Sequence, residues 1–230
     1  MIPRYRLHYA PDNASLVIRL ALEDLGAPYE AVLVDRRARA QKSPAYLALN
    51  PGGLIPVLET SHGPIFETGA ILLWLADRHG GAPAPDDDSR GDFLKWLFLL
   101  SNTLHPTLRM TFYPDQYVGG DAPAQARLRV AMQARFDACL DMIDARAAPF
   151  FGADHPTLLD PYLACLMRWR ALYPQGAVGD VRADRWPRLL PMLDRLERSE
   201  AATAAIAAEG LGPRPFSVPD YPDPPEGAAL

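Results

Sequence analysis

Residues 50–58 read Asn-Pro-Gly-Gly-Leu-Ile-Pro-Val-Leu, and residues 66–71 read Phe-Glu-Thr-Gly-Ala-Ile. The first stretch predicts a turn followed by a short apolar strand that contains Pro56. Because proline has no N–H to donate to a sheet, a proline at this place needs an explanation. A cis bond between Ile55 and Pro56 supplies one, since it would turn the N–H and C=O of Ile55 toward an extended peptide.

The second stretch predicts the start of a helix. Glu67 and Thr68 precede a strongly apolar run over residues 70–75. They place an acid, a hydroxyl and free main-chain N–H groups at a helix N-terminus, which is a favourable site for a carboxylate. A strand edge that binds main chain, beside a helix end that binds a carboxylate, suits a small peptide with an α-carboxylate.

Both motifs, in this order and at this separation, strongly resemble those of the glutathione transferase superfamily, in its bacterial beta-like or a related branch. The resemblance implies an α/β thioredoxin-like N-terminal domain followed by an all-α C-terminal domain. It also implies glutathione as co-substrate, with its cysteinyl part on the main chain of Ile55, set by Pro56, and its γ-glutamyl end at Glu67 and Thr68. A homodimer is implied as well, because such transferases usually form dimers.

Composition narrows the remaining classes. The chain has 230 residues, is 49% hydrophobic and carries a net charge of −5, so there is no electrostatic case for binding nucleic acid or an anionic membrane. Its apolar runs are too short to span a bilayer, and its first residues lack a signal-peptide core. Cys139 and Cys165 have no metal-ligand spacing. We expect reduced core cysteines, no metal site and a cytoplasmic location.

Periodicity divides the chain into four regions. Residues 1–80 form the glutathione-binding domain, residues 81–90 a linker rich in glycine, proline and acid, residues 91–211 an all-helical domain and residues 212–230 a proline-rich, irregular tail. In the first domain the predicted strands are 6–9, 29–34, 55–58 and 64–66, the predicted helices are 16–22 and 67–78, and residues 44–49 are expected to form a short helix or a turn. In the second the predicted helices are 91–111, 124–147, 158–172, 186–200 and, more weakly, 201–209.

Two local signals refine the helical domain. Pro106 falls inside the first of its helices and is expected to kink or split it. Thr157 and Asp160 form a capping box with Asp in place of Glu, a pattern that the resembled family also shows, and its role is folding rather than chemistry.

The chemistry implied by the resemblance needs the bound thiol as a thiolate. A free thiol has a pKa of about 8.5, and lowering it by about two units takes about 2.7 kcal/mol. One hydrogen bond to the charged sulfur supplies roughly 1.5–3 kcal/mol, and a helix N-terminus adds roughly 0.3–1 kcal/mol. A single hydroxyl at the start of the first helix can therefore suffice, which makes residues 9–15 decisive.

This segment departs from the family's common patterns. Beta-like relatives carry a cysteine where this chain has Ala14, and serine-type relatives carry a serine where it has Asn13. Ser15 is our first candidate for the thiol contact. Asn13 can donate an amide N–H instead, and Tyr9 stands near the place of the hydroxyl in tyrosine-type relatives. Two of these groups can act together.

Other site residues are less sharply indicated. A cation is expected near the glycine carboxylate of glutathione, and we choose Lys42 over Arg37 and Arg39. His105 falls where beta-like relatives place a histidine in the second-substrate pocket. Tyr113 is the aromatic residue we assign to the same pocket, with Phe112 and Tyr117 as further aromatic residues of that region.

The first functional hypothesis is a glutathione transferase that conjugates the glutathione thiolate to a small hydrophobic electrophile. The alternatives are a glutathione-dependent disulfide reductase or peroxidase without a protein cysteine, a non-catalytic glutathione-binding protein, and an isomerase that uses glutathione as cofactor. The vacant cysteine position favours the second hypothesis, the lack of a clear hydroxyl favours the third, and Ser15 alone does not exclude the fourth.

Overall fold

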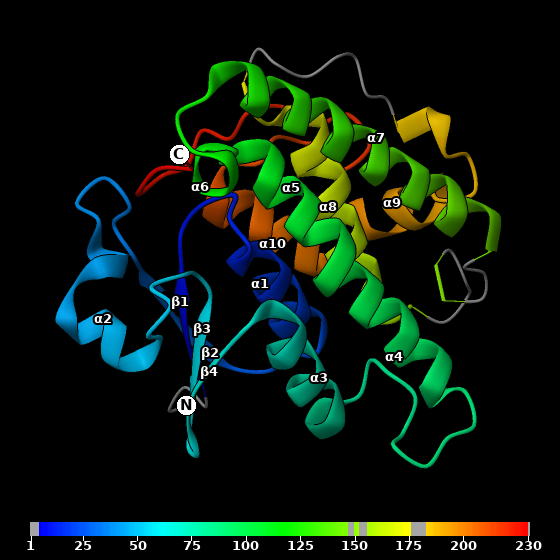
Figure 1. Ribbon diagram of the computed structural model, residues 1–230. Coiled ribbons are helices and arrows are strands. Elements are labelled where there is room, and N and C mark those ends of the chain that lie inside the picture. Colours follow the sequence, from blue (N-terminus) through cyan, green and yellow to red (C-terminus); the bar gives the residue numbers. More distant parts are fainter. Residues whose placement is uncertain (1–4, 147–149, 152–155, 176–182, 230) are drawn as a thin grey trace.

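The structure is a computed structural model, and it describes residues 5–146, 150–151, 156–175 and 183–229. Residue 147, the last of the predicted helix 124–147, and residue 230, the last of the predicted tail, lie outside these ranges. Figure 1 shows a small sheet with helices on both of its faces, next to a larger group of helices.

The sheet has four strands in the order β2-β1-β3-β4. β1 pairs parallel with β2 and antiparallel with β3, and β3 forms an antiparallel hairpin with β4. β3 begins later than residue 55, where we predicted its start, because Pro56 has no N–H to give and regular pairing starts at Val57. The strands are β1 (Tyr5–Tyr9), β2 (Tyr29–Leu33), β3 (Val57–Thr60) and β4 (Gly63–Phe66).

Helices α1 (Ser15–Asp24) and α3 (Thr68–His79) lie on one face of this sheet, and α2 (Pro44–Leu49) lies on the other (Figure 1). Gly26 ends α1 with a φ of 59°, a conformation that glycine adopts without a steric penalty. Ser43 starts α2 by accepting the main-chain N–H of Tyr46 at 3.2 Å. The arrangement is thioredoxin-like, and this part of the fold prediction is confirmed.

Beyond α3, the long regular elements that the structure describes are helices, which confirms the all-α expectation. The helix predicted over 91–111 is divided, as expected near Pro106, by a π-helical segment, Leu100–Leu104, that ends two residues before this proline. Proline lacks the N–H of a regular helical bond, and a π-helical turn accommodates that loss locally. The helices are α4 (Arg90–Leu99), α5 (His105–Phe112), α6 (Asp115–Val118), α7 (Ala122–Arg146), α8 (Leu159–Leu172), α9 (Leu190–Glu197) and α10 (Glu200–Glu209).

The residues of the predicted capping box, Thr157 and Asp160, lie at the start of α8. The hydroxyl of Thr157 accepts the N–H of Leu159 at 3.3 Å. The carboxylate of Asp160 accepts a hydrogen bond from Arg195 of α9 at 2.7 Å. Burial raises the pKa of Asp160 to about 7, against the opposing effects of Arg195 and of the Thr157 main chain. The box therefore also joins α8 to α9.

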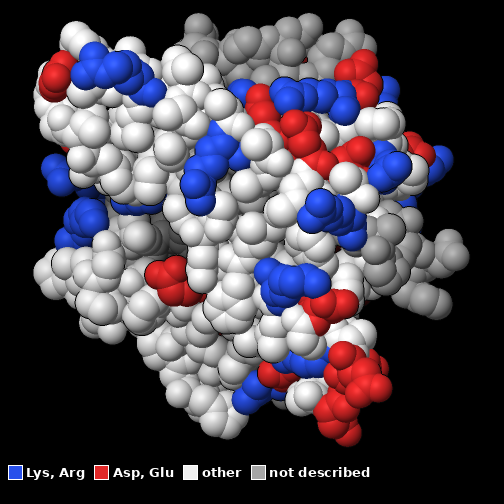
Figure 2. All heavy atoms as spheres, turned by 45° about the vertical axis from the view of Figure 1, so that its right-hand side comes forward, with Lys and Arg blue, Asp and Glu red and all other residues white. Residues whose placement is uncertain are grey.

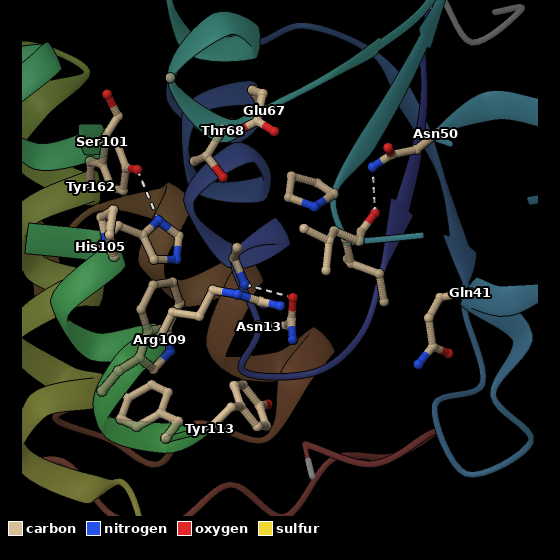
Figure 3. A pocket seen from close by; sticks show the side chains of 18 of the residues that line it. Asn13, Gln41, Asn50, Glu67, Thr68, Ser101, His105, Arg109, Tyr113 and Tyr162 are labelled. Atoms are coloured by element: carbon tan, nitrogen blue, oxygen red, sulfur yellow. Dashed lines mark hydrogen bonds between the residues drawn. The ribbon is translucent and has the colours of Figure 1, made fainter. Parts of the chain in front are cut away.

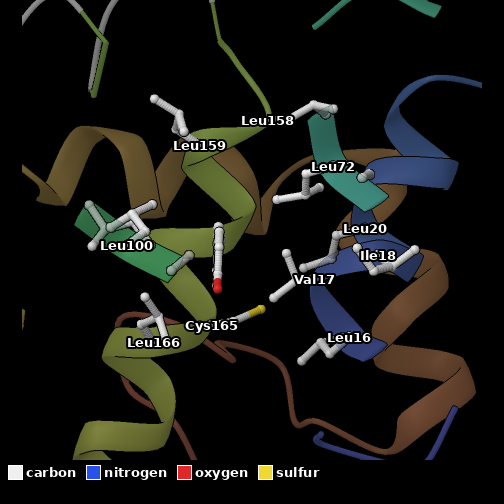
Figure 4. Close-up of a cluster of buried hydrophobic side chains, with 14 of the residues drawn as sticks. Leu16, Val17, Ile18, Leu20, Leu72, Leu100, Leu158, Leu159, Cys165 and Leu166 are labelled. Atoms are coloured by element: carbon white, nitrogen blue, oxygen red, sulfur yellow. The ribbon is translucent and has the colours of Figure 1, made fainter. Parts of the chain in front are cut away.

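One hydrophobic core extends across both groups of elements. Figure 4 shows leucine and valine side chains of α1 and Leu72 of α3 facing those of α8, with Cys165 between them. Cys165 is fully buried, and burial raises the pKa of its thiol. Cys139 is half-buried on α7, and both cysteines are free. The sheet layer and the helical layer therefore depend on each other for burial of apolar surface.

A buried ion pair joins the loop after β1 to α8. The guanidinium of Arg168 donates from Nε and Nη2 to the two carboxylate oxygens of Asp12 at 2.9 and 3.0 Å, and both side chains are fully buried. Trp169 Nε1 and the hydroxyl of Tyr173 donate to the same carboxylate at 2.8 and 2.7 Å. Every carboxylate oxygen thus has two donors, which is what a buried charge requires.

The tail after α10 is fastened to the same ion pair. Arg168 also donates to the main-chain carbonyls of Pro215 and Asp220, each at 3.0 Å. Asp223 donates its N–H to the carbonyl of Gly210, where a Cβ would lie 1.9 Å from the Asp223 oxygen. Gly210 is therefore required both by its φ of 64° and by this close approach. The tail runs from here back toward the sheet (Figure 1).

The surface carries both signs of charge. Figure 2 shows one face on which basic and acidic side chains gather in mixed groups. A largely uncharged area lies between these groups. Ion pairs such as Arg185–Asp141, at 3.2 Å, join oppositely charged side chains at the surface. That face offers no broad basic patch of the kind that attracts nucleic acid. Within the described ranges, we find no helix whose length and apolarity would let it cross a membrane.

Replacing Arg168 tests how far the fold depends on the buried pair. We expect Arg168→Met to lower the free energy of unfolding by about 3–5 kcal/mol, because the buried Asp12 carboxyl group loses its main partner. The double variant Asp12→Asn/Arg168→Met should be more stable than Arg168→Met alone. Urea denaturation followed by circular dichroism measures both.

The control is Lys95→Met, which removes an exposed pair with Asp92 and should cost no more than about 1 kcal/mol. A loss from Arg168→Met as small as that of the control would contradict the assigned role.

Candidate active site

A cavity of about 880 Å³ lies between the sheet layer and the helical layer. The loop after β1, the turn before β3 and the start of α3 form one side of it, and α4, α5 and α8 form the other. Figure 3 shows Glu67, Thr68 and Asn50 opposite His105, Arg109 and Tyr113. Ligands bound here would touch both halves of the chain.

The turn before β3 is held by Asn50. Its side-chain oxygen accepts the N–H of Gly52 at 2.9 Å, and its amide nitrogen donates to the carbonyl of Leu54 at 2.9 Å (Figure 3). Gly53 has a φ of 59°, and a Cβ there would lie 2.7 Å from Lys42 Nζ. The turn therefore needs glycine at this position.

Ile55 follows this turn and lines the cavity together with Pro56, and the peptide bond between them is cis. Among the described residues, no hydrogen bond engages the main chain of Ile55 outside regular elements. Its N–H and C=O are therefore available to an extended peptide in the cavity.

The start of α3, for which the sequence predicted a binding role, also lies at the cavity. Glu67 has a φ of 73°, which is strained for a residue with a side chain, and strain of this kind concentrates at binding sites. Thr68 is buried and is the first residue of α3. Both line the cavity. The first N–H groups of α3 have no partner within the helix, so they can bind a carboxylate.

The three candidates for the thiol contact are placed differently. Asn13 lines the cavity, and its side-chain oxygen accepts the N–H of Ala14 at 2.8 Å. Because an N–H can bond only to the amide oxygen, this contact fixes the side-chain orientation and leaves the NH₂ group free to donate.

Ser15 and Tyr9 are not among the residues that line the cavity. Ser15 is fully buried, and its hydroxyl bonds to the main-chain oxygen and N–H of Ala10 at 3.1 and 3.2 Å. Tyr9 donates its hydroxyl to Glu226 of the tail, and burial and this contact raise its pKa. Our ranking of Ser15 above Asn13 is therefore not supported, because the helix turns Ser15 inward.

The remaining predicted residues line the cavity. Lys42 does so and donates to the carbonyl of Gly52 at 3.2 Å, whereas Arg37 and Arg39 are exposed and do not. His105 lies in the helical wall, with Nδ1 at 2.9 Å from the hydroxyl of Tyr162. Burial and nearby Arg109 lower the pKa of His105 to about 4, so its ring is neutral at physiological pH. Tyr113 lines the same side of the cavity.

Sequence reasoning missed Arg36, Ser101 and Arg109, which also line the cavity. One signal was available, because Ser101, His105 and Arg109 are spaced four residues apart and so share one face of a helix. Nothing in the sequence indicated Arg36, which reaches the cavity from the loop after β2. Within the described ranges, no His, Cys, Asp and Glu side chains are grouped to hold a metal ion.

Comparison with known proteins agrees with this geometry. The family model of the glutathione S-transferase N-terminal domain matches residues 14–78. A glutathione S-transferase of Xanthomonas campestris pv. campestris is 30% identical over 216 residues, which cover 90% of this chain and 99% of that protein. This chain belongs to the glutathione S-transferase superfamily.

Two further relatives show which ligand and which reactions occur in proteins similar to this chain. The solved structure of a sphingomonad glutathione S-transferase complexed with glutathione is 28% identical, with a TM-score of 0.73, and the match covers 90% of this chain and all of that one. The disulfide-bond oxidoreductase YfcG of Escherichia coli is 27% identical over 184 residues, 73% of this chain and 84% of that protein. The superfamily therefore includes relatives named for different reactions.

The titration of His105 gives a test of its surroundings. In the unfolded chain it binds a proton near its ordinary pKa of 6.5, and in the folded chain only near pH 4. Between these values the unfolded state holds more protons, so stability falls as the pH drops from about 6.5 to about 4. We expect His105→Asn to remove up to roughly 3 kcal/mol of that fall.

Urea denaturation at neutral and acidic pH measures this difference. The control is His62→Asn on the exposed β3–β4 turn, which should leave the pH dependence unchanged. A His105 ring that titrates near its ordinary pKa by NMR would contradict the burial we describe.

Proposed function

We propose that the protein is a glutathione transferase that activates the thiol of glutathione with Asn13 and transfers it to an electrophile held against α5. The observation that carries the proposal is the placement of Asn13. Its free NH₂ group lies in the same cavity as the available main chain of Ile55 and the start of α3. Figure 3 shows Asn13 between these groups and α5.

Each part of glutathione has a matching group in this proposal. The cysteinyl main chain pairs with the N–H and C=O of Ile55, beside Pro56. The γ-glutamyl carboxylate accepts hydrogen bonds from the N–H groups at the start of α3 and from the Thr68 hydroxyl. Glu67 binds the α-amino group. The glycine carboxylate lies near Lys42, with Gln41 beside it in the cavity wall.

The reaction follows from this placement. The Asn13 amide donates to the sulfur and favours the thiolate over the thiol. The thiolate attacks the electrophilic carbon, a C–S bond forms, and the leaving group departs with its bonding electrons. Positioning of the two reactants in one cavity supplies the rest of the acceleration. A homodimer and a cytoplasmic location are part of the same proposal and rest on the family membership.

A second candidate is a glutathione-dependent disulfide reductase. Neither cysteine lines the cavity, so the chemistry would have to use two glutathione molecules rather than a protein thiol. The thiolate of one glutathione would attack the mixed disulfide between the other glutathione and a small thiol. The small thiol would leave, and glutathione disulfide would form. The similarity to a disulfide-bond oxidoreductase supports testing this activity with a small mixed disulfide.

Asn13→Ala tests the thiol contact. We expect the pKa of bound glutathione to rise by about one to two units, because a hydrogen bond to a charged group is worth roughly 1.5–3 kcal/mol. The ultraviolet absorption of the thiolate, followed over pH, reports this pKa directly. Ser15→Ala should leave it unchanged. The opposite result, with a raised pKa only in Ser15→Ala, would return the role to Ser15.

Thr68→Val tests the γ-glutamyl contact. Loss of the hydroxyl should weaken glutathione binding by about tenfold, since a lost hydrogen bond to a carboxylate costs roughly 1.5–3 kcal/mol. Isothermal titration calorimetry gives the affinity. Thr60→Val is the matched control, because the Thr60 hydroxyl bonds to Gly63 in the hairpin and does not line the cavity. Equal affinity in the two variants would contradict the assignment.

A further inference from the structure

Beside Tyr113, at the end of α5, the cavity holds two arginines that the transfer reaction does not use. Arg109 projects from α5 and Arg36 from the loop after β2, and both are half-buried. Arg109 donates to the neutral side chain of Gln116 at 2.9 Å and lies 5.7 Å from the ring centre of Tyr113. Arg36 donates to the Tyr113 hydroxyl at 3.1 Å and to the carbonyl of Ala229.

Neither arginine has a carboxylate partner among the described residues. The cavity is lined by two acids, and both are committed elsewhere. Asp12 is fully buried against Arg168, and Glu67 lies at the start of α3, where it serves glutathione in our proposal. The helical side of the cavity therefore has an excess of positive charge.

The groups around Arg109 are uncharged. His105 is neutral at physiological pH for the reasons given above, and Ser101 and Tyr113 carry hydroxyls. Apolar side chains line other parts of the same cavity: Leu73, Leu97, Phe98 and Phe112. Figure 3 shows Arg109 extending from α5 toward the loop that carries Asn13. An anion beside Arg109 would thus lie close to the proposed position of the sulfur.

We propose that this side of the cavity binds the carboxylate of the second substrate, with Arg109 as the main contact and Arg36 in support. The second substrate is then an electrophile or a disulfide with an apolar body and a carboxylate, which narrows the small hydrophobic electrophile that the sequence suggested. This inference rests on the proposed function. Its physical basis is the planar guanidinium, which binds a carboxylate through two parallel hydrogen bonds, in a partly desolvated wall.

Two matched electrophiles test the inference. Para-(chloromethyl)benzoate and para-(chloromethyl)benzamide differ in charge and hardly in shape. In both reactions the thiolate forms a C–S bond to the benzylic carbon and chloride leaves with the C–Cl electrons. We expect the wild-type kcat/KM, corrected for the uncatalysed rate, to be about 10- to 100-fold higher for the benzoate.

Arg109→Gln should remove this preference by lowering kcat/KM for the benzoate by about 10- to 100-fold more than for the benzamide. Arg109→Lys should keep part of the preference, because it retains the charge without the planar pair of donors. Arg127→Gln is the matched control, since Arg127 is exposed on α7 and does not line the cavity. It should behave as the wild type.

Binding of the products separates this inference from the proposed function. Calorimetry with S-(para-carboxybenzyl)glutathione and its carbamoyl counterpart needs no turnover. Tighter binding of the carboxylate that Arg109→Gln abolishes supports the carboxylate site, even if the protein turns over neither electrophile and the transferase proposal fails. Equal binding of both products, with turnover of both electrophiles and no loss of affinity for glutathione disulfide in Arg109→Gln, overturns the carboxylate site and leaves the transferase proposal standing.

The same titrations identify the source of the carboxylate. If Arg109→Gln weakens binding of glutathione disulfide but not of the benzyl product, the site serves a second glutathione. If it weakens the benzyl product, the site serves an acidic electrophile. Unchanged affinity for both ligands in Arg109→Gln overturns the proposal.

Discussion

The buried pair of Asp12 and Arg168 is the contact on which the rest of the structure depends. Its cost is high, because two charges leave water, and it is tolerated because the carboxylate receives four donors and the guanidinium also binds two carbonyls of the tail. Asp12 adopts a φ of 47°, which is unusual for a residue with a side chain. The pair fixes that conformation, and with it the direction of the neighbouring Asn13.

A second buried carboxylate extends this arrangement. Glu209 at the end of α10 accepts the main-chain N–H of Asp12 at 2.8 Å and the Nε of Arg19 at 2.7 Å. Helix α1, the loop after β1, α8 and the tail are therefore joined by charged hydrogen bonds inside a common apolar core. The loop after β1 is thus held from several sides, as a preorganised binding site requires.

The two sides of the cavity contribute different kinds of group. The sheet layer offers mainly main-chain N–H and C=O groups, at Ile55 and at the start of α3, and these suit a constant peptide ligand. The helical layer offers side chains, including His105, Arg109 and Tyr113, whose identity can change without disturbing the sheet. In the proposed function, the glutathione end of the site is thus set by backbone geometry, and the second-substrate end by the sequence of α5.

The sequence by itself determined the thioredoxin-like layer, the helical layer and the roles proposed for Ile55, Pro56, Glu67 and Thr68. These features are local, because a proline, a glycine turn or a helix start fixes the backbone of its own neighbours. Tertiary structure alone decided that Asn13 faces the cavity and Ser15 does not, and it alone brought Arg36 beside Tyr113. These outcomes depend on how α1 packs against α8 and how the tail returns to the sheet, through contacts between residues more than 150 positions apart. Such contacts leave no periodic signal in the sequence, so only the packed structure specifies them.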